Sequence, residues 1–175
     1  MDGSKKIMLD ADVIIHFYRG NHLPLLPHIF PNEFIICDIL LEFEIFPGPL
    51  NDILQDLIDK QEISVVELEQ QEHNLEILME YGELLNRFGK GESACMAYCK
   101  FSQNVIGSSN LKDILAYCKG NSIQFITTMG FLKKAFETGL LSEEECNIFV
   151  HKNLEKGSKL PCKTFTEFRR QEGNF

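Results

Sequence analysis

The stretch that decides the fold is Lys6-Ile7-Met8-Leu9-Asp10-Ala11-Asp12, in which three consecutive apolar residues run directly into acidic ones. An apolar run without alternating polar residues is typical of a strand that is covered on both faces. Four further runs of this kind follow, at Phe34–Cys37, Ile63–Val66, Val105–Ser108 and Gln124–Thr127. The chain therefore contains five candidates for buried parallel strands.

Segments with helical spacing of apolar residues follow these runs. The helices that the spacing predicts cover 12–19, 39–46, 51–60, 72–88, 92–102, 110–119, 130–138 and 142–153. Short strands that alternate with helices predict an α/β fold, here a three-layer α/β/α sandwich around a mostly parallel sheet. We expect one domain over residues 1–155, followed by a C-terminal segment, 156–175, that is either a packed arm or a frayed tail.

Composition and charge narrow the class of protein. The chain has 175 residues, of which 44% are hydrophobic and 25% charged, as in globular domains. No apolar run reaches the ~18 residues of a membrane span, and no signal-peptide core precedes the first acids, so we expect neither a membrane protein nor a secreted one. The six cysteines match no zinc-binding pattern, which predicts reduced, buried thiols in a cytoplasmic protein.

The net charge of −9 is unevenly spread along the chain. Residues 51–80 contain nine acids and one lysine, whereas residues 151–175 contain six basic residues and three glutamates. The acidity is mostly a property of one segment, so the net charge does not exclude an RNA substrate.

Acidic residues recur where the predicted strands end. Asp10 follows the first strand, and Glu42 and Glu44 lie on the helix after the second. Glu92 opens a helix after a glycine-rich break, and Asp113 lies one turn into the helix that follows the fourth strand. Because the carboxyl ends of parallel strands meet at one edge of a sheet, these acids are expected to converge. Clustered carboxylates repel one another, and a hard cation such as Mg²⁺ or Mn²⁺ relieves that repulsion.

Each acid also has a purely structural explanation. Asp10 suits a helix cap, and Asp12 and Glu92 suit the first turn of a helix, where the helix dipole favours an acid. Glu42 and Glu44 lie about 200° apart on a helix, so only one of them can face the strand edge. The recurrence at strand ends, rather than any single residue, favours a metal site.

Several motifs occur in the order found in one protein family. The stretch Leu9–Asn21 resembles the opening of PIN domains, and Gly89–Tyr98 looks like the Gly-Glu-x-x-Ala element of a bacterial and archaeal PIN subgroup. Val105–Asp113 takes the place of that subgroup's strand–Asp-Asp–helix element. Phe125–Ala135 and Gly139-Leu140-Leu141 resemble its ending. The resemblance covers roughly residues 7 to 150.

The resemblance implies a ribonuclease that depends on Mg²⁺ or Mn²⁺, in which a metal-activated water attacks the RNA phosphodiester. Many relatives are toxins of toxin–antitoxin pairs, whose small partner protein masks the acidic site. By position, Asp10 and Glu92 are metal ligands. The second acid is Glu44, because it lies at the family's usual distance from Asp38, which is expected to cap the helix. Glu42 remains an open alternative.

The chain departs from the family at the fourth acid, where Ser108 and Ser109 stand in place of aspartates. Either Asp113 reaches in from one turn later, or the metal has one carboxylate fewer and accepts Ser or Asn oxygens. The alternative function is a degenerate, non-catalytic PIN-like module that binds RNA or protein.

Two amphipathic stretches, 51–60 and 72–88, indicate a lid or a homodimer contact. In the second stretch, we expect Leu75, Leu78 and Leu85 to point inward.

Overall fold

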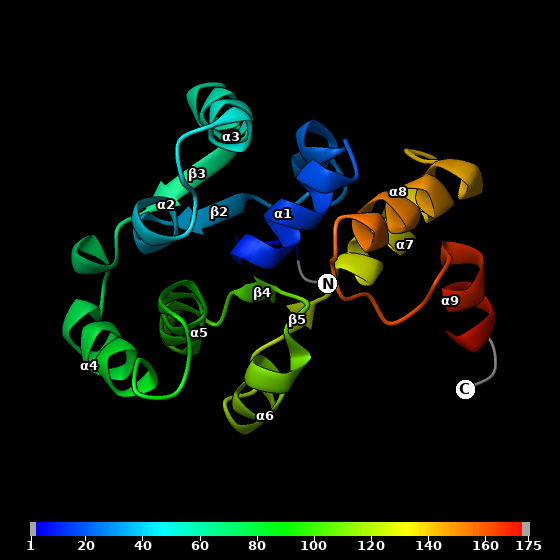
Figure 1. The fold of residues 1–175 in the computed structure, drawn as a ribbon. Helices are drawn as coiled ribbons and strands as arrows, with labels where there is room; N and C mark the ends of the chain where they lie inside the picture. The colour runs from blue at the N-terminus through cyan, green and yellow to red at the C-terminus, as the bar shows by residue number, and fades with distance from the viewer. Residues whose placement is uncertain (1–2, 173–175) are drawn as a thin grey trace.

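The computed structural model describes residues 3–172 and has a central parallel sheet with helices on both faces (Figure 1). The strands are β1 (Ile7–Leu9), β2 (Phe34–Cys37), β3 (Ile63–Val66), β4 (Val105–Gly107) and β5 (Phe125–Ile126). They are ordered β3-β2-β1-β4-β5, and every neighbouring pair is parallel. The predicted α/β fold, with three layers and a parallel sheet, is confirmed.

Nine α-helices and two short 3₁₀ helices connect and cover these strands within the described residues. The α-helices are α1 (Ala11–Arg19), α2 (Asp38–Phe43), α3 (Pro49–Asp59), α4 (Asn74–Leu84), α5 (Lys90–Ser102), α6 (Leu111–Gly120), α7 (Thr128–Glu137), α8 (Glu143–Glu155) and α9 (Phe165–Glu172). The 3₁₀ helices are η1 (Leu23–His28) and η2 (Leu68–Gln70). None of the helices in residues 3–172 is long and apolar enough to cross a membrane.

Alternate strand residues face two separate cores. Ile7 and Leu9 of β1 pack in the core that contains residues of α1, α3, α7 and α8. Met8 packs in the second core, with residues of α4, α5 and α6. Figure 1 shows these two groups of helices on opposite sides of the sheet. Burial on both faces explains why the central strands β1, β2 and β4 read as apolar runs in the sequence.

The strand order changes direction between β1 and β4. The chain builds β1, β2 and β3 outward in one direction, then returns to the other side of β1 for β4 and β5. The backbone N–H of Asp10 donates to the carbonyl of Gly107 at 2.9 Å, so the chain that leaves β1 lies beside the end of β4. Ligands bind at such reversal points in open α/β sheets.

Two helices differ most from their predicted extent, and the other predicted helices agree to within two residues at each end. The second helix ends at Phe43 rather than at residue 46, so Glu44 lies at its C-terminal cap. The predicted stretch 72–88 forms a shorter helix, α4, which buries Ile77 and Leu84. Leu75 and Leu85 are 71% and 39% exposed, so their predicted inward orientation is wrong. The buried face of α4 is centred on Ile77, and Leu75 projects from a different side of the same turn.

The C-terminal segment is packed against the domain as far as it is described. Its helix α9 contacts α8 and α7, and Cys162 and Phe165 belong to the same core as β1. All six cysteines are buried and form no disulfide, as the sequence predicts.

Candidate functional site

Asp10 connects the end of β1 to the start of α1. Its Oδ1 accepts a hydrogen bond from the backbone N–H of Ala11 at 2.8 Å, as expected for a helix cap. The side chain is only 3% exposed. Burial, followed by the charge of Asp12, raises the pKa of Asp10 well above its ordinary value. Asp10 is therefore a helix cap and also an acid whose ionised form is poorly stabilised by its surroundings.

Asp12 lies beside Asp10 and contacts the loop after β4. Its Oδ2 accepts from the backbone N–H of Ser109 at 2.7 Å and from the Ser108 hydroxyl at 3.5 Å. Its Oδ1 is buried and has no hydrogen-bond partner among the described residues. Burial raises the pKa of Asp12 to about 6. Asp12 lies in the first turn of α1, as expected, but its carboxylate is half-buried against the loop after β4 rather than exposed.

Glu92 and Asp113 are joined through one amide. The Asn110 Nδ2 donates to Glu92 Oε1 and, at 2.7 Å, to Asp113 Oδ2. Burial raises the pKa of Glu92, the Asn110 amide offsets part of that rise, and the charge of Asp113 adds to it. Asp113 thus reaches the acidic residues from one turn into α6, which is the first of the two alternatives left open for the fourth acid.

Glu44, rather than Glu42, is directed toward the other acids. Its Oε1 accepts from the backbone N–H of Gly91 at 2.6 Å. A Cβ atom on Gly91 would lie 2.7 Å from the Glu44 carboxylate, so the glycine leaves room for this contact. Glu42 is exposed on α2. The geometry therefore favours Glu44 as the second acid.

Glu44 and Glu92 approach the same point on the backbone. A Cβ atom built on Gly89 would lie 3.8 Å from Glu92 Oε2 and 3.9 Å from Glu44 Oε1. The charge of Glu44 also contributes to the raised pKa of Glu92. The charge of Glu92 in turn raises the pKa of Asp10, so the acids that follow β1, end α2 and open α5 repel one another at one end of the sheet.

Hydroxyl groups hold the loop that supports Asp12. Ser108 is fully buried, and its Oγ accepts from the Asn110 backbone N–H at 3.2 Å. The Ser109 Oγ donates to the Thr128 hydroxyl and accepts from the Thr128 backbone N–H, both at 2.8 Å. The same Thr128 hydroxyl lies 2.8 Å from His16 Nδ1. Burial, with a smaller effect of Arg19, lowers the pKa of His16 to about 4, so this histidine is neutral at pH 7.

The donor set suits a hard divalent cation, because it consists of carboxylate and hydroxyl oxygens. Within residues 3–172, no lysine or arginine forms an ion pair with Asp10, Asp12 or Glu92. The unpartnered Asp12 Oδ1 gives such a cation a buried ligand. In the conformation described, however, no three His, Cys, Asp or Glu side chains form a complete set of metal ligands. The Gly91 N–H and the Asn110 amide instead occupy one oxygen each of Glu44 and Glu92.

The sequence prediction named Asp12 as a first-turn acid and Ser109 in place of a family aspartate but assigned neither of them a role in the site, and it did not include Thr128. Asp12 and Asn110 had a detectable signal, since each follows a strand that ends at the reversal point. Thr128 had no such signal in the local sequence, because its partner His16 is 112 residues away.

Comparison with known family models, curated proteins and solved structures found no match to this chain.

Proposed function

We propose that the chain is a ribonuclease that depends on Mg²⁺ or Mn²⁺, with its reaction centre at the carboxyl ends of β1 and β4. The observation that carries the proposal is the pair of buried Asp10 and half-buried Asp12, both with raised pKa values, and the buried, unpartnered Oδ1 of Asp12. The order of acids along the chain, which resembles that of PIN domains, supports RNA as the substrate.

Each acid has a distinct role in this proposal. Asp10 and Asp12 hold the cation, and Glu44 and Asp113 extend the negative field around it. When bound, a divalent cation neutralises phosphodiester charge and lowers the pKa of water. Glu92 keeps its proton at a higher pH than an ordinary glutamate, and Asn110 orients it. Glu92 adds a third carboxylate to the cation site, and a bound cation would favour the loss of its proton.

The test is RNA cleavage by the Asp10→Asn variant. Asparagine caps helices as well as aspartate does, so α1 is preserved while one carboxylate is lost. We expect cleavage to be abolished and the melting temperature to stay the same or rise, because like-charge repulsion is relieved. Asp52→Asn, which removes an exposed acid from α3, is the matched control and should cleave RNA normally. Cleavage at the native rate by Asp10→Asn rejects the proposal.

A second candidate is a non-catalytic module that binds RNA through the same edge. It is favoured by Ser108 and Ser109 at the family's acidic positions and by the lack of a complete ligand set within residues 3–172. This candidate predicts RNA binding that chelators leave unchanged and no cleavage with Mg²⁺ or Mn²⁺.

We further propose a cytoplasmic location and a protein partner. Six buried, unpaired thiols suit a reducing compartment. A small antitoxin-like protein that covers the acidic edge would inhibit the reaction, as the resemblance implies. Leu75 and Met79, which are 71% and 70% exposed on α4, offer an apolar surface for a homodimer. Light scattering of the wild type and of Leu75→Lys, across a range of concentrations, tests the homodimer.

A further inference from the structure

A cavity of about 480 Å³ lies directly beside the acidic site. Ser109, whose backbone N–H binds Asp12, is part of its lining, and so is Thr127, which follows β5. The cavity thus opens at the same edge of the sheet as the acids, at the ends of β4 and β5. Its volume is within the range of roughly 300–1,000 Å³ typical of small-molecule sites.

The C-terminal segment forms one wall of this cavity. Lys159, Leu160 and Phe168 line it, together with Met129 of α7. The wall is apolar and includes one aromatic ring, with a single cation, Lys159. Lys159 is exposed and forms no hydrogen bond or ion pair with the residues that the structure describes. The cavity therefore combines an aromatic surface with an available positive charge.

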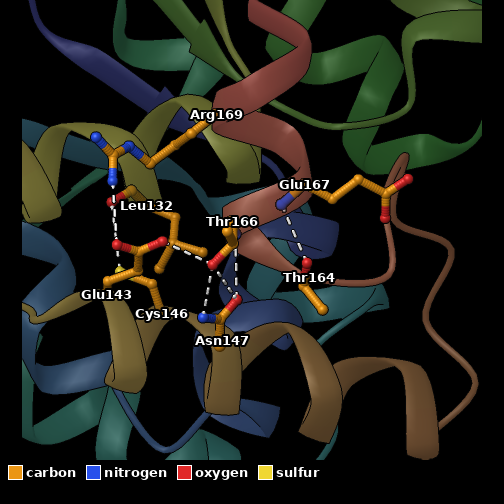
Figure 2. Close-up of polar contacts among 8 residues, drawn as sticks. All are labelled: Leu132, Glu143, Cys146, Asn147, Thr164, Thr166, Glu167 and Arg169. Carbon is orange, nitrogen blue, oxygen red and sulfur yellow. Dashed lines mark hydrogen bonds and ion pairs between the residues drawn. The ribbon is translucent and has the colours of Figure 1, made fainter.

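A polar clamp fixes this wall to the domain (Figure 2). The Thr166 hydroxyl donates to Glu143 Oε1 at 2.6 Å, and the Thr166 backbone N–H donates to Asn147 Oδ1 at 3.1 Å. Arg169 forms an ion pair with Glu143 at 3.3 Å. Phe165 is fully buried beneath the clamp and lies next to Phe168, with ring centroids 6.4 Å apart. Phe168 is thus held in place before any ligand arrives.

We propose that this cavity binds the nucleobase of an RNA nucleotide next to the cleaved phosphodiester, with Lys159 contacting a phosphate. The proposal rests on the proposed function, since it adds a substrate subsite to the same edge of the sheet. Charge complementarity supports a nucleotide as the occupant. Residues 151–175 carry six basic residues against three acids, in a chain whose net charge is −9. A base also gains from stacking on an aromatic ring whatever its identity.

The experiment measures mononucleotide binding by chemical-shift titration, with EDTA and separately with Mn²⁺. The probes are 5′-AMP, 5′-UMP and the base-free ribose 5-phosphate. We expect the nucleotides to bind at least tenfold more tightly than ribose 5-phosphate. Phe168→Leu, which keeps apolar volume but removes the ring, should weaken nucleotide binding about tenfold. Lys159→Ala should weaken nucleotides and ribose 5-phosphate alike.

Lys163→Ala is the matched control, because it removes the same charge from the same exposed segment outside the cavity lining. It should bind all probes as the wild type does. Equal affinity for nucleotides and ribose 5-phosphate, no effect of Phe168→Leu, or no nucleotide binding in either buffer overturns the cavity proposal.

Failure of the cavity and failure of the proposed function give different results. Mn²⁺ binding without nucleotide binding rejects the cavity alone. Ring-dependent nucleotide binding in EDTA, with no Mn²⁺ binding and no RNA cleavage, supports the cavity and rejects the ribonuclease.

Discussion

At the residue scale, Asp10 and Asp12 are placed side by side by the first turn of α1. The N–H groups of Ala11 and Ser109 stabilise their charges in part. Burial nevertheless outweighs these hydrogen bonds, since the pKa values of both acids are raised. Without a cation, the folded chain is therefore strained at neutral pH by carboxylates that are poorly solvated and repel each other.

The Asp12→Asn variant should reveal this strain as a pH-dependent gain in stability. Folded Asp12, with a pKa of about 6 instead of 3.8, holds its proton more tightly than unfolded Asp12. Its contribution to the free energy of unfolding is therefore present below pH ~4 and lost as the pH rises through 6. In metal-free buffer, the variant should match the wild type near pH 4 and be more stable by about 2–3 kcal/mol above pH 6.5. Urea unfolding measures the difference, and a difference that does not change with pH contradicts the account.

Gly91→Ala should weaken cation binding with little effect on stability. The new Cβ would lie 2.7 Å from the Glu44 carboxylate, which can swing away because it ends a flexible side chain. Alanine favours the helix by up to about 1 kcal/mol, so the free energy of unfolding should stay within about 1 kcal/mol of the wild type. Without Glu44, we expect Mn²⁺ affinity to fall about tenfold by calorimetry.

Gly82→Ala is the control for this substitution. Gly82 lies on a different helix, α4, and a Cβ atom built on it would have no other atom within 4 Å. Undiminished Mn²⁺ affinity in Gly91→Ala would show that Glu44 plays no part in the site.

At the element scale, the central strands β1, β2 and β4 were predictable because each is an apolar run buried on both faces, whereas the edge strands β3 and β5 are partly exposed. The helix α9 was not predicted, because its sequence, FTEFRRQE, is short and mostly polar. The helix is stabilised by the clamp to α8 and by the burial of Phe165. These contacts involve residues that are distant in the sequence, so the local sequence does not indicate them. The end of α2 was placed too late, which hid the location of Glu44 at the helix cap rather than on a helical face.

The candidate site was likewise predictable only where the local sequence marks its residues. Asp10, Glu92 and Asp113 could be identified from the sequence, because each stands near the end of a strand or the start of a helix. The Ser109–Thr128–His16 contacts could not, because nothing in the local sequence marks residues that meet only after β4, β5 and α1 have assembled.

Thr166→Val should loosen the C-terminal segment from α8. It removes the 2.6 Å hydrogen bond to Glu143 while preserving the shape of the side chain. We expect a loss of about 1 kcal/mol in the free energy of unfolding and faster tryptic cleavage after Lys156, Lys159 and Lys163. Thr138→Val, at an exposed helix end, is the control and should be cleaved like the wild type. Equal cleavage of both variants would mean that the clamp does not hold the segment.

At the scale of the whole molecule, charge is divided between two regions. The acids of the candidate site and of residues 51–80 repel RNA, whereas the basic C-terminal segment lies beside the site and attracts it. A cation at the site would remove the strongest local repulsion just where a phosphodiester has to approach. The account therefore depends on whether the acidic residues bind a divalent ion.

Calorimetric titration of Mn²⁺ into the metal-free chain tests that claim most directly. The account predicts saturable binding at one site, lost in Asp10→Asn and in Glu92→Gln and retained in Asp52→Asn. Absence of binding up to millimolar Mn²⁺, or binding that survives both site substitutions, would contradict it.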